Sequence, residues 1–144
     1  MSKNNSLDKA PDNILVAIKE AQARSGYLSR SSIEKLAESF HVPINEVYGV
    51  ASFYSFLAIK PMGRNVIRIC RSLPCYLKNC QIIIDAVKQE IGIKPGQTTA
   101  DGRFSFELTN CIGLCDKAPA MLINNDAHVD LTPERISQIL KSYK

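Results

Sequence analysis

The sequence lacks the features that mark a secreted or membrane-spanning protein. Its first residues, MSKNNSLDKAP, are polar and contain no apolar core of the kind that a signal peptide needs. The longest uncharged stretch, residues 47–59, has thirteen residues and is too short to cross a bilayer. We therefore expect a cytoplasmic protein with no direct membrane insertion. Cysteines in that compartment stay reduced unless a metal or catalysis uses them.

Motifs for nucleotide binding, nucleic-acid binding and acid/base catalysis are also missing. No GxGxxG opens a strand–helix unit, and no GxxxxGK[ST] is present. Eighteen Lys and Arg against fourteen Asp and Glu form no basic block, so no nucleic acid is expected as a partner. No set of His and carboxylate residues suggests acid/base chemistry. If the chain holds a redox centre, we expect it to pass electrons, with no substrate site of its own.

What the chain does have is cysteine at informative spacing. CRSLPC places four residues between Cys70 and Cys75, and CIGLC places three between Cys111 and Cys115. Each first cysteine lies at or just after the end of a predicted strand, and each second one lies in or just past a loop. Loops at strand ends are where a rigid sheet presents ligands. Gly113 lets the backbone approach a cluster and point its amides at the sulfurs.

Spacing alone leaves three uses of these cysteines open. Structural zinc sites favour two residues between paired cysteines, although wider gaps occur. A [2Fe–2S] cluster is larger and takes two thiolates on each iron, so wide and unequal loops suit it. Free or redox-active thiols are the third use, although a thioredoxin-type pair needs a two-residue gap. The fifth cysteine, Cys80, falls on the apolar face of a predicted helix and is interpreted as a buried hydrophobic residue.

Hydrophobic periodicity predicts an α+β chain with helices first. Residues 1–11 are expected to be a flexible N-terminus, residues 12–60 a bundle of three short helices, and residues 61–144 a second domain. The second domain has strands at 65–70, 103–110 and 120–124, a possible strand at 128–130, and helices at 77–91 and 131–143.

Two local patterns in the first half carry specific expectations. Ser31 followed by Glu34 is a capping-box pattern at the start of the second helix. The segment VYGVASFYSF contains four aromatic residues, which we expect mostly in the core, with some left to cover a partner surface.

The motifs CRSLPCYL and CIGLCDKAPAMLINN together resemble the thioredoxin-like [2Fe–2S] subunit family. GYLSRSSIEKLAESFHVPINEVYGVASFYSFL is similar to that family's N-terminal helical segment, and LTPERISQIL resembles its last helix. Its members include the small peripheral-arm subunit of respiratory complex I. Relatives occur in NAD(P)-linked hydrogenases, formate dehydrogenases and electron-bifurcating complexes. The similarity covers about residues 14–140. KNC, at residues 78–80, departs from the family pattern and leaves the surroundings of Cys80 open.

The resemblance implies a cofactor, a fold and partners. It implies that Cys70, Cys75, Cys111 and Cys115 ligate one [2Fe–2S] cluster. It implies a thioredoxin-like α/β domain behind the helical bundle. The expected partners are an iron–sulfur subunit that binds FMN and NAD(P), and a further catalytic iron–sulfur subunit. Pro119 stands where thioredoxin-like folds often have a cis-proline, and a trans bond is the alternative there.

Three functions follow as hypotheses. The first is an electron-transfer subunit of a soluble hydrogenase, formate dehydrogenase or electron-bifurcating transhydrogenase, which the sequence contexts RSLPC and CDKAP favour. The alternative is a peripheral-arm subunit of NADH–quinone oxidoreductase, complex I. A zinc-stabilised interaction module is a hypothesis of a different class. Cations near the cysteines in sequence, namely Arg68, Arg71, Lys78 and Lys117, would raise the potential of a cluster, which we still expect below zero.

Overall fold

The structure, a computed structural model, describes residues 13–143, and the expected flexible N-terminus at residues 1–11 lies outside them. The chain divides into two compact units, one ending at Pro61 and the other beginning at Met62. In the part of the chain that the structure describes, no helix combines the length and apolar character needed to cross a membrane.

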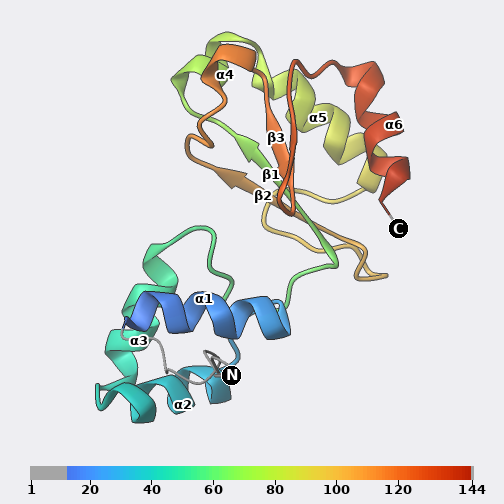
Figure 1. Ribbon diagram of the computed structural model, residues 1–144. Helices are drawn as coiled ribbons and strands as arrows, with labels where there is room; N and C mark the ends of the chain where they lie inside the picture. The colour runs from blue at the N-terminus through green and yellow to red at the C-terminus, as the bar shows by residue number, and fades with distance from the viewer. Residues whose placement is uncertain (1–12, 144) are drawn as a thin grey trace, which may run out of the picture. The chain divides into compact units, whose positions relative to one another are not determined.

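The first unit consists of three helices, α1 (Ile14–Ser25), α2 (Arg30–Phe40) and α3 (Ile44–Phe53) (Figure 1). Gly26 ends α1 in the left-handed conformation, which glycine adopts without a steric cost. The side chains that face one another across the three helices and the loops between them form one small apolar core, made of Ile18, Leu28, Ile33, Ala37, Val47 and Ala51. The three predicted helices are thus confirmed.

Two sequence predictions about this unit are wrong. The N-cap of α2 is Ser29, whose hydroxyl accepts a hydrogen bond from the Ser32 amide, and not Ser31. The helix begins earlier than the capping-box pattern suggested because Ser29, and not Ser31, is the last residue with an extended backbone. The four aromatic side chains expected mostly in the core are instead between two fifths and four fifths exposed; they are Tyr48, Phe53, Tyr54 and Phe56.

The second unit has a four-stranded sheet and three α-helices. Its strands are β1 (Asn65–Cys70), β2 (Phe104–Thr109), β3 (Met121–Ile123) and β4 (Asp126–His128). Its helices are α4 (Leu73–Leu77), α5 (Cys80–Ile91) and α6 (Pro133–Ser142), and a 3-10 turn, η1 (Cys115–Lys117), precedes β3. The strand order is β2-β1-β3-β4, with β1 parallel to β2 and the other two pairs antiparallel.

One face of this sheet carries the larger core. Alternate residues of β1 point to this face, so Ile67 lies beside Phe106 of β2 and Ile123 of β3. The helices α5 and α6 supply the other half of the core, through buried residues such as Val87 and Ile136 (Figure 1). The alternation of NVIRIC and RFSFELT therefore predicted these strands and their inward residues correctly.

The segment after Cys70 differs from its prediction. A single helix over 77–91 was expected, but the backbone breaks at Asn79, which takes a left-handed conformation between α4 and α5. Cys75 consequently lies inside the short helix α4 and not in a loop. The last strand, β4, covers 126–128 and shares only His128 with the expected range, because its register follows a tight turn at Asn124 and Asn125.

Candidate metal centre

The sheet topology brings the cysteine segments to one end of the second unit. Cys70 is the last residue of β1 and Thr109 the last of β2, and the two are register partners. Because the strands are parallel, their carboxyl ends lie at the same edge of the sheet. The amide of Arg71 donates to the Thr109 carbonyl over 3.0 Å, which extends this pairing beyond the strands. Cys111 follows Thr109 by two residues and so begins its loop beside Cys70.

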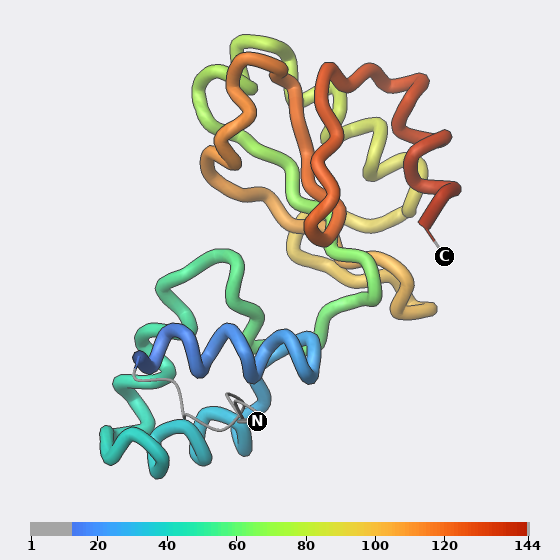
Figure 2. The backbone as a smooth tube through the Cα atoms, in the orientation of Figure 1, coloured from blue at the N-terminus to red at the C-terminus, as the bar shows by residue number. Residues whose placement is uncertain are grey.

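The start of β3 closes the same end. Since β3 is antiparallel to β1, its first residue Met121 lies beside Ile69, near the end of β1. The segment from Cys111 to Ala120 therefore passes close to the β1–α4 connection, as the backbone trace shows (Figure 2). The Ala118–Pro119 peptide bond in this segment is cis, so the cis alternative is the one that the structure contains.

The first cysteine pair is buried. Cys70 is 1% and Cys75 2% exposed, and their thiols share a hydrogen bond. Burial raises the pKa of the Cys70 thiol, but hydrogen bonds from Ser72, Cys75 and the Ile112 amide outweigh it, so this pKa lies below its ordinary value. Burial and the neighbouring Cys70 raise the pKa of Cys75 to about 11, although the Ala120 amide opposes them.

The second cysteine pair is exposed. The Sγ atoms of Cys111 and Cys115 lie 3.3 Å apart. Gly113, in the left-handed conformation with φ of 81°, donates its amide to Cys111 Sγ over 3.4 Å. The hydrogen bond from Cys111 raises the pKa of Cys115, and so do Cys70 and Asp116 nearby. The sequence expectation that Gly113 would let an amide approach a sulfur is met.

The two pairs face each other across this end of the unit. The Ile112 amide, from the second loop, donates to the Cys70 sulfur. The negative charge of a Cys70 thiolate raises the pKa of Cys115, so the two side chains lie within reach of this interaction. Within residues 13–143, no three side chains of His, Cys, Asp or Glu gather closely enough to hold a single ion. Each thiol contacts the other member of its own pair, Cys70 with Cys75 and Cys111 with Cys115. Sequence reasoning did not find the amides of Ser72, Ile112 and Ala120. The amides of Ile112 and Ala120 approach a sulfur only through the fold, whereas Ser72 lies two residues after Cys70.

The fifth cysteine lies next to this site but faces the core. Cys80 is 1% exposed at the start of α5, among the apolar side chains of the larger core. Burial raises the pKa of its thiol, and the nearby Cys70 raises it further. Cys80 is thus a buried residue in the neighbourhood of the first pair.

A two-and-two set of thiols with amides at the sulfurs suits a [2Fe–2S] cluster. Each iron of such a cluster takes two thiolates, and hydrogen bonds to the sulfurs tune its potential. The donor set is soft sulfur throughout. The residues present therefore fit this cofactor.

The sequence model of the thioredoxin-like [2Fe-2S] ferredoxin family matches residues 2–144. The chain belongs to this family. The family resemblance inferred from the cysteine loops is confirmed, and so is the fold class. One [2Fe–2S] cluster is the family's cofactor and that of this chain. Among the uses that spacing left open, the family match thus selects iron–sulfur over zinc or free thiols.

Named relatives of this ferredoxin-family chain come from NADH-quinone oxidoreductases. The E subunit of NADH-quinone oxidoreductase from Escherichia coli K12 is 44% identical over 128 residues, which cover 89% of this chain and 77% of that protein. Its counterpart from Pseudomonas aeruginosa PAO1 is 39% identical over 127 residues, covering 88% and 76%. These relatives support the complex I alternative. The preference for soluble complexes, which rested on the contexts RSLPC and CDKAP, is therefore replaced by that alternative.

A solved structure extends the comparison. The NAD+-reducing [NiFe]-hydrogenase in its H2-reduced state matches with a TM-score of 0.79 and 29% identity, over 90% of this chain. The match spans only 22% of the hydrogenase chain. This ferredoxin-family chain therefore has the fold of one part of a much longer polypeptide.

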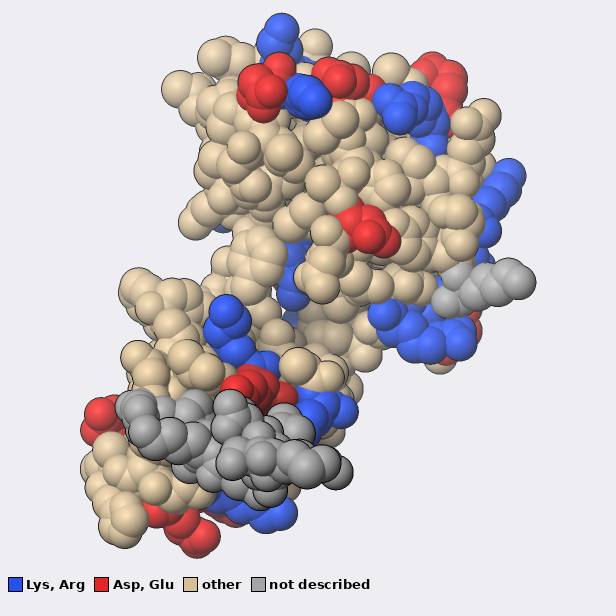
Figure 3. Space-filling view, in the orientation of Figure 1, with Lys and Arg blue, Asp and Glu red and all other residues tan. Residues whose placement is uncertain are grey.

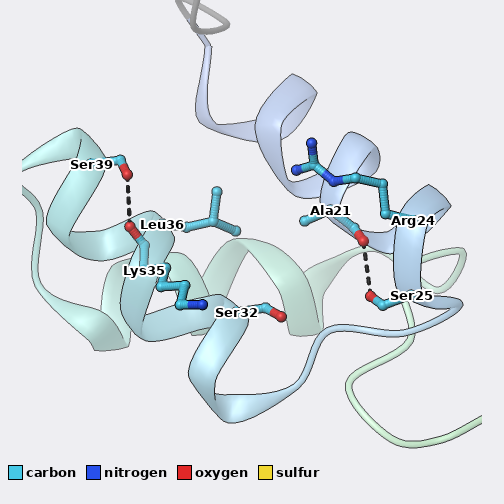
Figure 4. A pocket seen from close by; sticks show the side chains of 7 residues that line it. All are labelled: Ala21, Arg24, Ser25, Ser32, Lys35, Leu36 and Ser39. Atoms are coloured by element: carbon cyan, nitrogen blue, oxygen red, sulfur yellow. Dashed lines mark hydrogen bonds between the residues drawn. The ribbon is translucent and has the colours of Figure 1, made fainter.

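A separate groove lies in the helical unit, whose sequence contains no cysteine. It has a volume of about 330 Å³ and runs between α1 and α2 (Figure 4). Ala21 and Leu36 line it with the cationic side chains of Arg24 and Lys35. The hydroxyls of Ser25 and Ser39, which also line it, donate to backbone carbonyls one turn earlier in their own helices. It has no thiol, so it is no part of the metal centre.

Proposed function

We propose that this chain is an electron-transfer subunit of an NADH–quinone oxidoreductase of the complex I type. In this proposal Cys70, Cys75, Cys111 and Cys115 ligate its [2Fe–2S] cluster. The observation that carries the proposal is the meeting of two thiol pairs at one end of the sheet. Cys111 and Cys115 are exposed while Cys70 and Cys75 are buried, so the site is open to a partner on the side of the second pair.

The residues of this chain hold and tune the centre. When bound, the cluster supplies one-electron chemistry. Amides of Ser72, Ile112 and Gly113 direct N–H groups at the sulfurs of Cys70 and Cys111, which stabilises negative charge there. The sheet and α5 support the buried pair, so the ligand positions are preorganised. The chain has a carrier role in this proposal and no substrate site.

Partners follow from the relatives. The hydrogenase named above reduces NAD+, and this chain matches 22% of its matched polypeptide. In the hydrogenase, the segment similar to this chain is covalently joined to the other segments of one polypeptide. Where such a segment is a separate chain, we expect it to bind the subunits that correspond to those other segments. The proposed partners are an iron–sulfur subunit that binds FMN and NAD(H), and a further catalytic iron–sulfur subunit. A cytoplasmic location also remains a prediction.

A hydrogenase-type complex is the second candidate. It is favoured by the structural match of TM-score 0.79 to the NAD+-reducing [NiFe]-hydrogenase. The two candidates differ in the reaction that the whole complex catalyses. Purification of the native complex separates them, because the first predicts NADH-dependent quinone reduction and the second predicts hydrogen-dependent NAD+ reduction.

The direct test uses the full chain purified without oxygen. We expect about two irons and two acid-labile sulfides per chain, and an EPR signal after reduction with dithionite. Addition of the purified flavin-containing partner and NADH should reduce the same cluster. A colourless chain with about one zinc would contradict the electron-transfer proposal. A cluster that NADH and the partner cannot reduce would contradict the assignment to an NADH-linked complex.

A further inference from the structure

The short helix α4 exposes its apolar side chains to an unusual degree. Leu73 is 68%, Tyr76 66% and Leu77 70% exposed. These three residues belong to one five-residue helix, and we call them the α4 platform. Single exposed apolar residues are ordinary, but three in one turn and a half form a contiguous patch of the kind that marks an interaction site.

Holding the metal centre does not by itself require this platform. Cys75 turns inward from the same helix and is 2% exposed, so a helix with polar outward residues would position its thiol equally well. Leaving leucine and tyrosine side chains in water is unfavourable, and burial against another protein removes that cost. Tyrosine is also enriched where one protein face meets another.

The platform lies beside the open side of the metal centre. The helix α4 connects Cys70 to the start of α5, and the Cys75 thiol reaches Cys70. The second loop, with exposed Cys111 and Cys115, approaches Cys70 through the Ile112 amide. A protein that covers the α4 platform therefore comes against the edge of the site where the thiols are exposed.

Charged residues around the platform have a net positive sign. Arg71 precedes α4, Lys78 ends it, and Lys117 ends the neighbouring turn η1; all three are exposed, with Asp116 as the nearby carboxylate. Figure 3 shows charged side chains of both signs at this end of the unit beside uncharged surface. A complementary partner face would be apolar at its centre and acidic at its rim.

We propose that the α4 platform is the docking surface for the flavin-containing iron–sulfur partner, which meets it with an apolar face edged by carboxylates. This proposal rests on the proposed function, because that function supplies the partner. The apolar centre provides affinity, and the cations orient the partner over the exposed cysteine pair.

Binding of the full, cluster-loaded chain to the purified flavin-containing partner tests the proposal. The double variant Tyr76→Ser, Leu77→Ser should weaken binding at least about tenfold, because buried tyrosine and leucine at an interface centre carry much of its affinity. Val16→Ser is the matched control: Val16 is an exposed apolar residue, 45% exposed, on α1 of the other unit. It should bind as the wild type does. Absorption and EPR spectra must show the same cluster in all three proteins.

A charge variant provides the second measurement. Lys78→Glu should weaken binding at low ionic strength, and its affinity should depend less on salt than that of the wild type. The proposal is overturned if the double variant binds the partner normally, if Val16→Ser is equally impaired, or if the double variant only dissolves a dimer of this chain. A wild-type chain that carries its cluster but does not bind the partner would instead overturn the proposed function together with this surface.

Discussion

Cys70 and Thr109 are register partners at the last positions of two parallel strands. This pairing determines the site, because it places the loop that begins at Cys111 next to the connection that carries Cys75. Neither cysteine motif contains information about the other. Their meeting depends on the parallel alignment of β1 and β2, which a chain segment of more than thirty residues separates.

The ligand assignment predicts a sharp difference between Cys75 and Cys80. Both thiols are almost fully buried, at 2% and 1% exposure. Cys75→Ser should lose the native cluster spectrum, because an iron would lose a thiolate. Cys80→Ala should keep the full content of iron and labile sulfide and lose only about 1 kcal/mol of stability from the small cavity. Metal analysis and EPR on both variants make the measurement.

The opposite pattern would change the site. If Cys80→Ala lost the cluster while Cys75→Ser kept an unaltered one, the ligand set would include Cys80. Cys80→Ala removes a whole sulfur atom from a buried site, whereas Cys75→Ser only exchanges sulfur for oxygen, so general unfolding would affect Cys80→Ala at least as strongly as Cys75→Ser.

Gly63 and Gly49 give opposite predictions for substitution by alanine. A Cβ at Gly63 would lie 2.8 Å from the Phe104 carbonyl carbon and 3.0 Å from the Ser105 amide, both backbone atoms that cannot move aside easily. We expect Gly63→Ala to destabilise the second unit by about 1–3 kcal/mol. At Gly49, inside α3, no atom lies within 4 Å of the added Cβ. Gly49→Ala should stabilise the helix by about 0.5–1 kcal/mol.

Denaturant unfolding of the two alanine variants checks this pair. A neutral Gly63→Ala would mean that the segment before β1 does not lie against β2 in solution. The close approach is supported independently by the Gly63 amide, which donates to the Ser105 hydroxyl over 2.7 Å.

His128 makes the stability depend on pH. Its Nε2 lies 2.9 Å from the Tyr143 hydroxyl, and that hydroxyl donates its proton in a hydrogen bond to Asp126 over 2.9 Å. Burial lowers the pKa of His128 below its ordinary value of 6.5, and Arg135 lowers it further while Asp126 opposes them. The unfolded chain therefore binds more protons than the folded chain as the pH falls below about 6.5. The stability that depends on a neutral His128 is therefore fully present above about pH 6.5 and is lost progressively as the pH falls below that value.

Unfolding free energies between pH 8 and pH 5 test this dependence. His128→Gln should flatten the decline below pH 6.5. His41→Asn, which changes an exposed histidine in the first unit at a left-handed position that asparagine tolerates, should keep the slope of the second unit. An unchanged slope in His128→Gln would show that another group causes the acid sensitivity.

Ser29 and Ser31 both stand near the start of α2, but only Ser29 is its N-cap. The Ser29 hydroxyl accepts from the Ser32 amide over 3.1 Å, whereas Ser31 lies inside the first helical turn. Ser29→Ala should cost the first unit about 1 kcal/mol of stability, because the amide loses its partner. Ser31→Ala should be close to neutral. Thermal unfolding of both variants decides, and a larger loss at Ser31 would restore the capping-box interpretation.

Local patterns determined most of the second unit. The alternation in NVIRIC predicted β1 at its observed bounds, since successive side chains of a strand point to opposite faces whatever the strand packs against. Gly26 marked the end of α1 for a similarly local reason, the low cost of a left-handed glycine. The cysteine loops, read together with the helical motifs, identified the family.

Local patterns failed where the outcome depends on neighbours from elsewhere in the chain. Phe53 is the last residue of the apolar helix α3 and Tyr54 follows it, yet they are 79% and 43% exposed. Three short helices enclose a core too small to bury every aromatic residue near it. The spacing of apolar residues also gave no sign of the backbone break at Asn79. The apolar spacing of 77–91 continues through Asn79, where the backbone takes the left-handed conformation that separates α4 from α5.

The sequence by itself determined most of the elements, the family and which cysteines stand in pairs, because these follow from local spacing and composition. Only the tertiary structure decided that the pairs meet, that Cys80 faces the core beside them, and that α4 turns Leu73, Tyr76 and Leu77 outward. Those outcomes depend on the parallel register of β1 and β2 and on which surfaces remain after the core is filled. Both are properties of contacts between distant segments, which no local pattern contains.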